Sequence, residues 1–211
     1  MSWASRLNVS SVFMNAELNH LIVFGRRPAL GVGKRRLAAE IGDLNAWRFQ
    51  RFALKHLTRT LSVDRRWRLW RCLTPDTPAS QRPADELPQG RGDLGARLAF
   101  ALKHAPPGHV VIIGSDAPQV RRTDIAAAFA ALARADVVIG PARDGGFWLI
   151  GLRACLRTRP PFSNVRWSSP HTLSDVLANL RGQRRLFLRE LEDVDDAASL
   201  ARVRAFMRQR F

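Results

Sequence analysis

The stretch His109-Val110-Val111-Ile112-Ile113-Gly114-Ser115-Asp116-Ala117-Pro118 decides the class of fold that we expect. Its run of β-branched residues predicts a short buried strand, and the Gly-Ser-Asp that follows predicts a turn. Other short apolar runs recur along the chain, separated by segments whose apolar residues are spaced three, four or seven positions apart. That spacing is typical of helices that pack one face on a sheet. The alternation therefore predicts an α/β fold with a mostly parallel central sheet flanked by helices.

The hydrophobic pattern also gives approximate boundaries for these elements. We expect strands at 21–24, 68–73, 109–113, 136–139, 147–152 and 185–188, and helices at 44–61, 94–102, 125–132, 173–180 and 200–207. Residues 74–92, rich in Pro, Gly, Asp and Gln, are expected to form the longest irregular loop. A length of 211 residues fits one domain, which we place at 19–211, with an N-terminal extension outside the core at 1–18.

The composition is strongly basic, with a formal net charge of +16, and only three of the 34 cationic residues are lysines. Clustered arginines bind polyanions, so a non-catalytic nucleic-acid-binding protein is one hypothesis. The arginines are spread over the whole chain, however, and a high Arg:Lys ratio also results from GC-rich codon usage. Nucleic acid is therefore not our expected partner.

Two cysteines lie far apart, without metal-ligand spacing, and indicate no oxidising compartment. The apolar runs are far shorter than the roughly 20 residues needed to span a bilayer, and the N-terminus lacks a secretory signal pattern. We expect a cytoplasmic protein without a membrane span.

The segment from Gly25 to Leu37, with the sequence GRRPALGVGKRRL, is a candidate phosphate-binding loop. Gly31 and Gly33 would let the backbone approach a ligand, and the basic residues from Lys34 open a predicted helix, where anions are favoured. The segment has neither the Walker A nor the GxGxxG spacing. A flexible basic loop would have the same composition, so that alternative stays open.

Carboxylates follow several of the predicted strands. Asp116, directly after a buried strand, suits a Mg²⁺ ligand, although capping of the next turn is equally plausible. Asp144 belongs to an Asp-Gly-Gly turn that could let a substrate lie against bare backbone. A second metal ligand would come from Asp193 or Asp195, whereas Asp196 is expected to cap the last helix.

From about Leu21 to Arg204, the order and content of these motifs resemble the bacterial DUF2064 proteins. This family is a branch of the GT-A superfamily of nucleotide-diphospho-sugar transferases, and its members are sometimes labelled as glycosyltransferases of arsenosugar biosynthesis. The residues that carry the resemblance are Arg27 to Leu37, Thr74-Pro75-Asp76, Gln89 to Gly95, Gly114 to Pro118, Gly140-Pro141 with Asp144-Gly145-Gly146, Trp167 to Pro170, and Asp193-Val194-Asp195.

The resemblance implies a three-layer, Rossmann-like GT-A fold and a Mg²⁺- or Mn²⁺-dependent transferase with a nucleotide-activated donor. A glycosyltransferase that moves a sugar from a nucleotide diphosphate to a small acceptor is the favoured function. The implied site has Asp116 and Lys34 as catalytic residues and Asp116 and Asp195 as metal ligands. The implied phosphate-binding residues are Gly25, Arg26, Gly33, Lys34 and Arg36, and the implied substrate-binding residues are Asp93, Asp144, Gly145, Gly146 and Trp167.

The same Lys-x-Arg-Leu loop and Ser-Asp-x-Pro strand end also resemble phospholactate guanylyltransferases. This second resemblance implies a nucleotidyltransferase that releases pyrophosphate. Neither resemblance identifies a general base, the donor base, the sugar, the acceptor or the oligomeric state.

Overall fold

The structure is a computed structural model that describes residues 19–208 of the chain. Its strands are β1 (Asn19–Arg26), β2 (Arg68–Thr74), β3 (Glu86–Leu87), β4 (His109–Gly114), β5 (Val137–Pro141), β6 (Phe147–Leu152) and β7 (Arg185–Phe187). Its helices are α1 (Arg35–Ile41), α2 (Asp43–Leu61), α3 (Leu94–His104), α4 (Arg122–Leu132), α5 (Thr172–Ala178) and α6 (Ala197–Arg208), with short 3₁₀ turns at Ala79–Gln81 and Ala154–Leu156. The predicted extension at 1–18 lies outside the described residues.

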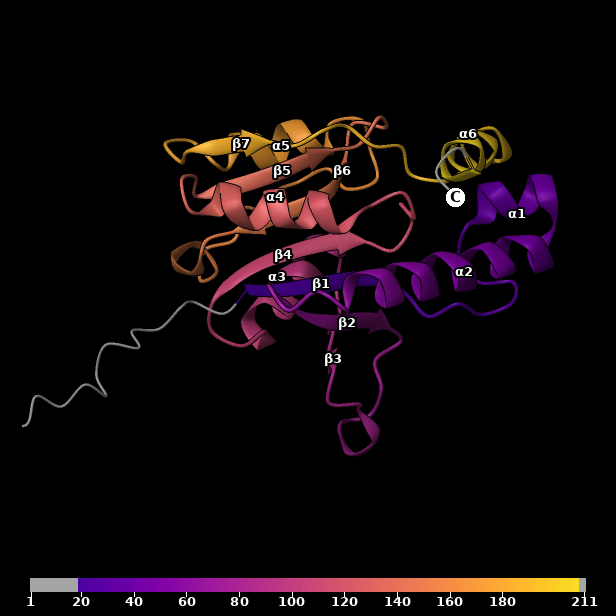
Figure 1. Ribbon diagram of the computed structural model, residues 1–211, viewed down its shortest axis with the longest axis horizontal. Helices are drawn as coiled ribbons and strands as arrows, with labels where there is room; N and C mark the ends of the chain where they lie inside the picture. The colour runs from indigo at the N-terminus through magenta and orange to yellow at the C-terminus, as the bar shows by residue number, and fades with distance from the viewer. Residues whose placement is uncertain (1–18, 209–211) are drawn as a thin grey trace, which may run out of the picture.

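The strands form one seven-stranded sheet in the order β3-β2-β1-β4-β6-β5-β7 (Figure 1). Every neighbouring pair is parallel except the two that involve β6, which runs antiparallel to β4 and to β5. The predicted α/β fold with a mostly parallel sheet is therefore confirmed. The strands β1, β4 and β5 all end at the same edge, where the β5–β6 turn also lies.

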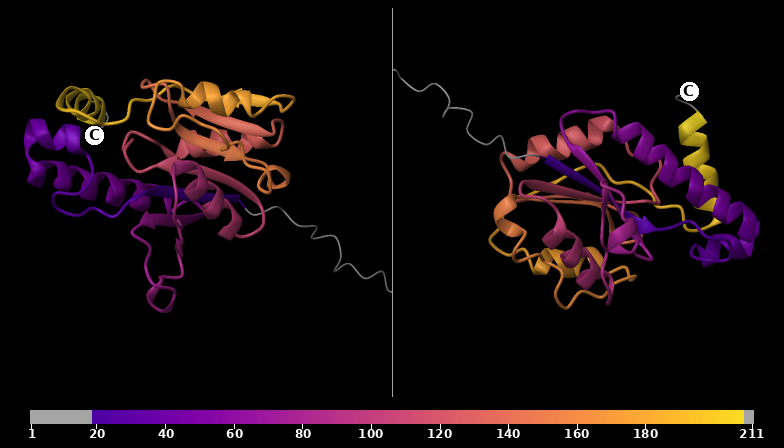
Figure 2. Two further views of the ribbon diagram at one scale, coloured as in Figure 1. Left: turned by 180° about the vertical axis from the view of Figure 1, so that it is seen from behind. Right: turned by 90° about the horizontal axis from the view of Figure 1, so that it is seen from below.

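Helices cover both faces of the sheet (Figure 2). On one face, Leu21 and Val23 of β1 pack with side chains of α2 and α4. On the other face, the alternate residues Ile22 and Phe24 pack with side chains of α3 and α5. Because successive residues of a strand point to opposite faces, continuous apolar strands are what a sheet buried on both sides requires.

A smaller core joins α1, the first half of α2 and α6 at the end of the molecule beyond the sheet (Figure 1). It contains Leu37, Phe49, Val194, Leu200 and Val203, all of them buried. Since Leu37 ends the basic segment Gly25 to Leu37 and Val194 belongs to the motif Asp193-Val194-Asp195, this core brings two distant motifs into one unit.

Each predicted strand and helix has a counterpart in the structure, with ends shifted by a few residues. Within the predicted loop 74–92, the structure adds the two-residue edge strand β3 and a 3₁₀ turn that projects away from the sheet (Figure 1). A two-residue strand is too short to give a periodic signal. Among the described helices, none has the length and apolar character needed to cross a membrane.

Candidate functional site

The ends of β1 and β4 lie side by side, with Phe24 opposite Gly114. The backbone N–H of Ser115 donates to the carbonyl oxygen of Phe24 at 3.1 Å. A Cβ atom on Gly25 would lie 2.3 Å from Oγ of Ser115, so only glycine allows this close approach. The phosphate-loop motif and the Ser-Asp motif therefore leave the sheet next to each other.

Lys34 joins the two acidic motifs at the start of α1. Its backbone has φ 46° and ψ 43°, a left-handed conformation. Its Nζ atom lies 2.8 Å from Oδ2 of Asp116 and 2.9 Å from Oδ1 of Asp195. Burial alone lowers the pKa of the Lys34 amine, but the two carboxylates outweigh burial and hold this pKa above its ordinary value. The ammonium group is thus charged and fixed between two carboxylates.

Backbone hydrogen bonds carry Asp195 to this position. The N–H of Leu191 donates to the carbonyl oxygen of Pro141 at the end of β5, and the N–H of Val194 donates to that of Asp116 at 3.3 Å. The segment before α6 therefore runs past the ends of β5 and β4 in turn. The side chain of Asp196 accepts from the backbone N–H of Ser199 at 2.7 Å, which confirms its expected role in capping α6.

Asp193 adds a further acid to this region, and its pKa is raised to about 7. Burial is the main cause, and the negative charge of Asp116 adds to it, whereas the Lys34 charge acts in the opposite direction. The negative charges of Asp144 and Asp195 also raise the pKa of Asp193.

A cavity of about 670 Å³ opens at this edge of the sheet. Eight of the predicted site residues line it: Gly25, Arg26, Gly33, Lys34, Arg36, Asp116, Asp144 and Asp195. Its other lining residues were not named as site residues, although several of them lie within the motifs quoted above: Phe24, Arg35, Gln50, Leu94, Gly114, Ser115, Ser168, Ser169 and Pro170. Ser168 to Pro170 could have been found from the sequence, because they belong to the family-like block Trp167 to Pro170. Gln50 could not, because it lies in a helix that contains no motif.

Four predicted substrate-binding residues do not line this cavity, and the structure shows other contacts for them. Asp93 caps α3, because its Oδ1 accepts from the backbone N–H of Ala96 at 2.8 Å. Trp167 packs against Phe147 and Phe162, with ring centroids 6.4 and 6.0 Å away. Their contact with a substrate stays a prediction.

The glycine pair after Asp144 shapes the turn between β5 and β6. Gly145 has φ +86°, and a Cβ atom there would lie 2.4 Å from the carbonyl oxygen of Pro170. The N–H of Gly146 donates to Oδ1 of Asp144 at 2.9 Å. Gly145 thus gives clearance to the loop around Pro170, while clearance for a substrate stays a prediction.

The loop after β2 fixes the position of the end of β1, which lines the cavity. Oδ1 and Oδ2 of Asp76 accept from the backbone N–H groups of Gln89 and Gly90 at 2.7 and 3.0 Å. The buried amide of Gln89 in turn donates to the carbonyl oxygens of Gly25 and Cys72, at 2.8 and 2.7 Å. Two more of the family-like blocks therefore position the strand end that bears Gly25.

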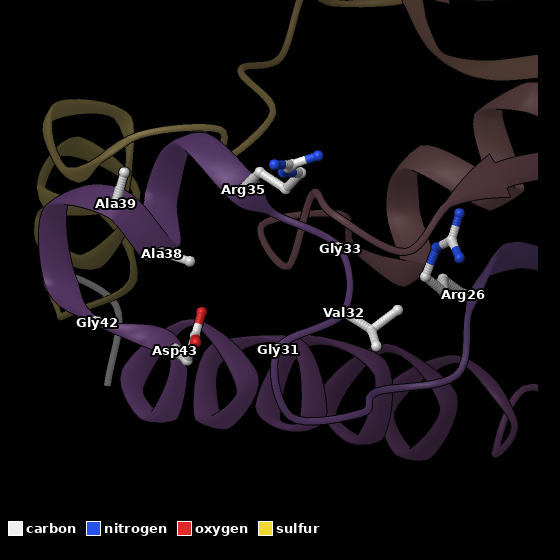
Figure 3. Close-up of a pocket in the computed structure, with 9 residues that line it drawn as sticks. All are labelled: Arg26, Gly31, Val32, Gly33, Arg35, Ala38, Ala39, Gly42 and Asp43. Atoms are coloured by element: carbon white, nitrogen blue, oxygen red, sulfur yellow. The ribbon is translucent and has the colours of Figure 1, made fainter.

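A second cavity, of about 750 Å³, lies between the basic loop, α1 and the start of α2 (Figure 3). Arg26, Gly33 and Arg35 line both cavities, so the two are neighbours. Asp43 and Ala38 point into the second cavity, whose remaining lining residues are Gly31, Val32, Ala39 and Gly42.

The carboxylates that line the first cavity suit Mg²⁺ or Mn²⁺ only where the protein supplies two of the metal's ligands. Within residues 19–208, no group of three or more His, Cys, Asp or Glu side chains is arranged to hold a metal ion. Asp116 and Asp195 nevertheless converge on one cation, the Lys34 ammonium. Mg²⁺ is commonly bound by one or two carboxylates together with substrate phosphates and water, and these two carboxylates suit that arrangement.

Several solved structures of nucleotide-using transferases are similar to this chain. A protein from Desulfovibrio desulfuricans G20, provisionally described as a nucleotide-diphospho-sugar transferase, is 25% identical with a TM-score of 0.77, over 90% of this chain and 97% of that one. The 4-diphosphocytidyl-2C-methyl-D-erythritol synthase of Anaerococcus prevotii DSM 20548 is 10% identical with a TM-score of 0.61, over 91% and 96%. CMP:2-keto-3-deoxy-manno-octonic acid synthetase, complexed with CTP, is 13% identical with a TM-score of 0.56, over 92% and 100%.

At these identities the two synthases show the fold alone. No curated protein matches this chain. Residues 53–169, which run from the middle of α2 to the loop that lines the cavity, match the family described as "Uncharacterized protein conserved in bacteria (DUF2064)". The match spans more than half of the sequence, and the chain belongs to the DUF2064 family.

Proposed function

We propose that this protein is a transferase with a nucleotide-activated donor, and specifically a glycosyltransferase that moves a sugar from a nucleotide diphosphate to a small acceptor. The observation that carries the proposal is the position of Lys34. Its amine lies within 2.9 Å of both Asp116 and Asp195, in a cavity that Arg26 and Arg36 also line. Cations for a diphosphate and oxygen ligands for a divalent metal are thus adjacent.

In this proposal the basic loop binds the donor. Lys34, Arg26 and Arg36 hold the two phosphates, and the bare backbone at Gly33 lets the loop approach them. These fixed positive charges also stabilise the negative charge that develops on the departing diphosphate. In the free protein the carboxylates of Asp116 and Asp195 accept from Lys34, so the donor phosphates give its ammonium an alternative set of acceptors.

Asp116 and Asp195 would hold Mg²⁺ or Mn²⁺, which when bound supplies charge neutralisation at the leaving phosphates. The neighbour from Desulfovibrio desulfuricans G20 supports the sugar-nucleotide class by its description, and the CTP complex supports nucleotide use within this fold. These two descriptions belong to other proteins, and they favour a nucleotide-activated donor without identifying its base or its sugar.

A thermal-shift screen of nucleotides and nucleotide sugars, with and without Mg²⁺, tests the proposal. A ligand at 100 times its dissociation constant adds about 2.7 kcal/mol to the free energy of unfolding. We expect nucleotide diphosphates and one class of nucleotide sugar to raise the melting temperature, more strongly with Mg²⁺. If RNA raises it and every nucleotide leaves it unchanged, the protein is a nucleic-acid binder and not a transferase.

A nucleotidyltransferase is the second candidate, because the synthase of Anaerococcus prevotii and the CMP-sugar synthetase share this fold. Such an enzyme attacks the α-phosphate of a nucleoside triphosphate and releases pyrophosphate. Pyrophosphate formed from GTP or CTP in the presence of a phosphorylated acceptor would favour this candidate. Slow hydrolysis of a nucleotide sugar to the nucleoside diphosphate would favour the glycosyltransferase.

A further inference from the structure

The first cavity has a basic end and an acidic end. Its four cationic lining residues come from the last position of β1 and from the start of α1: Arg26, Lys34, Arg35 and Arg36. Its acids come from other elements: Asp116 follows β4, and Asp144 lies in the turn between β5 and β6. The third acid, Asp195, precedes α6 and pairs with Lys34 at the basic end. Because β4 lies between β1 and the β5–β6 pair in the sheet, charge changes sign along the edge of the sheet.

Asp144 differs from the other carboxylates that line the cavity. Asp116 and Asp195 both pair with Lys34, whereas Asp144 makes no ion pair with any described Lys, Arg or His side chain. Its Oδ1 accepts from the N–H of Gly146, which fixes the side chain without neutralising it. Asp144 is also exposed, so its carboxylate is accessible to a ligand in the cavity. Asp193 lies nearby but is not among the lining residues.

The wall formed by Ser168, Ser169 and Pro170 completes this end of the cavity. The hydroxyl of Ser169 is used internally, because it donates to the carbonyl oxygen of Arg166 at 2.7 Å. Ser168 has φ +57°, and its hydroxyl has no hydrogen-bond partner among the described residues. The acidic end therefore offers a free carboxylate and a free hydroxyl.

We propose that this end binds an uncharged hydroxyl compound as the acceptor, and that Asp144 is the catalytic residue that takes the proton of the attacking hydroxyl. The inference rests on the proposed glycosyl transfer and names its acceptor class and its base. A phosphorylated acceptor is disfavoured, because its negative charge would lie beside the unpaired charge of Asp144.

The step is a substitution at the anomeric carbon of the donor sugar. The acceptor oxygen forms a bond to that carbon, and the bond between the carbon and the diphosphate oxygen breaks. The bonding electron pair leaves with the nucleoside diphosphate, and the acceptor proton moves to the free oxygen of Asp144. General base catalysis of this kind contributes about 10² to 10⁴ in rate.

The test compares the wild type with Asp144→Asn. The asparagine oxygen can still accept from Gly146, so the turn is kept while the base is lost. The probes are the nucleotide sugar that binds best in the thermal screen, with glycerol and glycerol 3-phosphate as acceptors that differ only in a phosphate. We expect glycerol to be glycosylated and glycerol 3-phosphate to remain unused. In Asp144→Asn, turnover should fall by about 10² to 10⁴ while the donor dissociation constant stays within twofold.

Asp43→Asn is the matched control, because Asp43 is an exposed carboxylate of the second cavity, and its substitution should leave turnover unchanged. Wild-type turnover in Asp144→Asn, or preference for glycerol 3-phosphate over glycerol, would overturn the inference while leaving nucleotide-sugar use intact. A wild type that binds nucleotide sugars but only releases pyrophosphate from triphosphates would instead remove the proposed glycosyl transfer, and the inference with it.

Discussion

Lys34 and Asp195 are 161 residues apart in the sequence, and their Nζ and Oδ1 atoms are 2.9 Å apart in the structure. Asp116 lies on the same ammonium group at 2.8 Å. The side chain of Lys34 is 8% exposed, against 41% for Asp116 and 49% for Asp195. The two carboxylates are thus more exposed than the Lys34 side chain that they flank, and all three side chains line the cavity.

Replacing Lys34 by Met should weaken the binding of a nucleoside diphosphate by tenfold to more than a hundredfold. A charge-assisted hydrogen bond contributes about 1.5 to 3 kcal/mol, and 1.4 kcal/mol corresponds to a factor of ten. Isothermal titration calorimetry measures the change. Lys55→Met, on the exposed face of α2 and away from both cavities, is the control and should bind like the wild type. Equal affinity in both variants would contradict a role for Lys34 in donor binding.

Replacing Gly145 by Ala should destabilise the fold more than replacing Gly182 by Ala. Both residues have nearly the same left-handed φ, +86° and +83°, so both variants lose about 1 to 2 kcal/mol in backbone conformation. The new Cβ at 145 meets the carbonyl oxygen of Pro170 at 2.4 Å, whereas none of the described atoms lies within 4 Å at 182. Overpacking should add about 1 to 3 kcal/mol at 145 only. Urea unfolding measures the free energy of unfolding of both variants. Equal decreases would show that the loop around Pro170 moves aside without cost.

The two cysteines should differ in alkylation. Cys155 is exposed, while Cys72 is buried, and burial raises the pKa of its thiol to about 12. At pH 8, iodoacetamide should therefore add one label to the folded protein and a second only after unfolding in urea. Intact mass spectrometry counts the labels. Rapid double labelling of the folded protein would show that the β2 region opens readily.

His20 should bind a proton only below the ordinary imidazole pKa of 6.5. Burial lowers the pKa of its imidazole, and a bond to the Pro107 carbonyl oxygen opposes that effect without cancelling it. Trp70 Nε1 donates to Nδ1 of His20 at 3.1 Å, which requires an unprotonated nitrogen there. Between the lowered pKa and 6.5 only the unfolded chain binds the proton, so this residue reduces stability as pH falls through that window.

NMR of the His20 ring is the suitable measurement, because Asp193 acts on stability in the opposite direction. With its pKa raised to about 7, Asp193 is protonated in the folded protein before the unfolded chain is, so it adds stability as pH falls. A series of nitrogen spectra from pH 8 downward should show Nδ1 of His20 without a proton at neutral pH and a titration midpoint below 6.5. A midpoint at or above 6.5 would rule out the buried neutral form.

Local sequence patterns predicted most of the fold, because most strands and helices are long enough to show their hydrophobic period. The direction of β6 could not be predicted, since alternation of apolar residues is the same in parallel and antiparallel strands. Asp-Gly-Gly at Asp144 indicated a turn between two strands, and the structure shows that this turn joins the antiparallel pair β5 and β6.

The candidate site was predictable where a motif ends a strand, as at Gly25 and Asp116. The site was not predictable where tertiary packing alone brings a residue to the cavity. Gln50, which lies in the middle of α2, is such a residue. Asp93 and Trp167 share the family-like pattern, but a helix cap and an aromatic cluster also need these residue types. A sequence pattern does not distinguish those demands from ligand contact.

The small core of α1, α2 and α6 links the spacing of Lys34 and Asp195 to packing outside the cavity. Leu37 stands three positions after the lysine of the site, and Val194 stands directly before one of its carboxylates. Interiors are close-packed, so a change in side-chain volume between α1 and α6 must be taken up by small shifts of the neighbouring backbone. Substitutions on the hidden side of α6 should therefore shift the separation of the Lys34 amine and the Asp195 carboxylate while the residues that line the cavity stay the same.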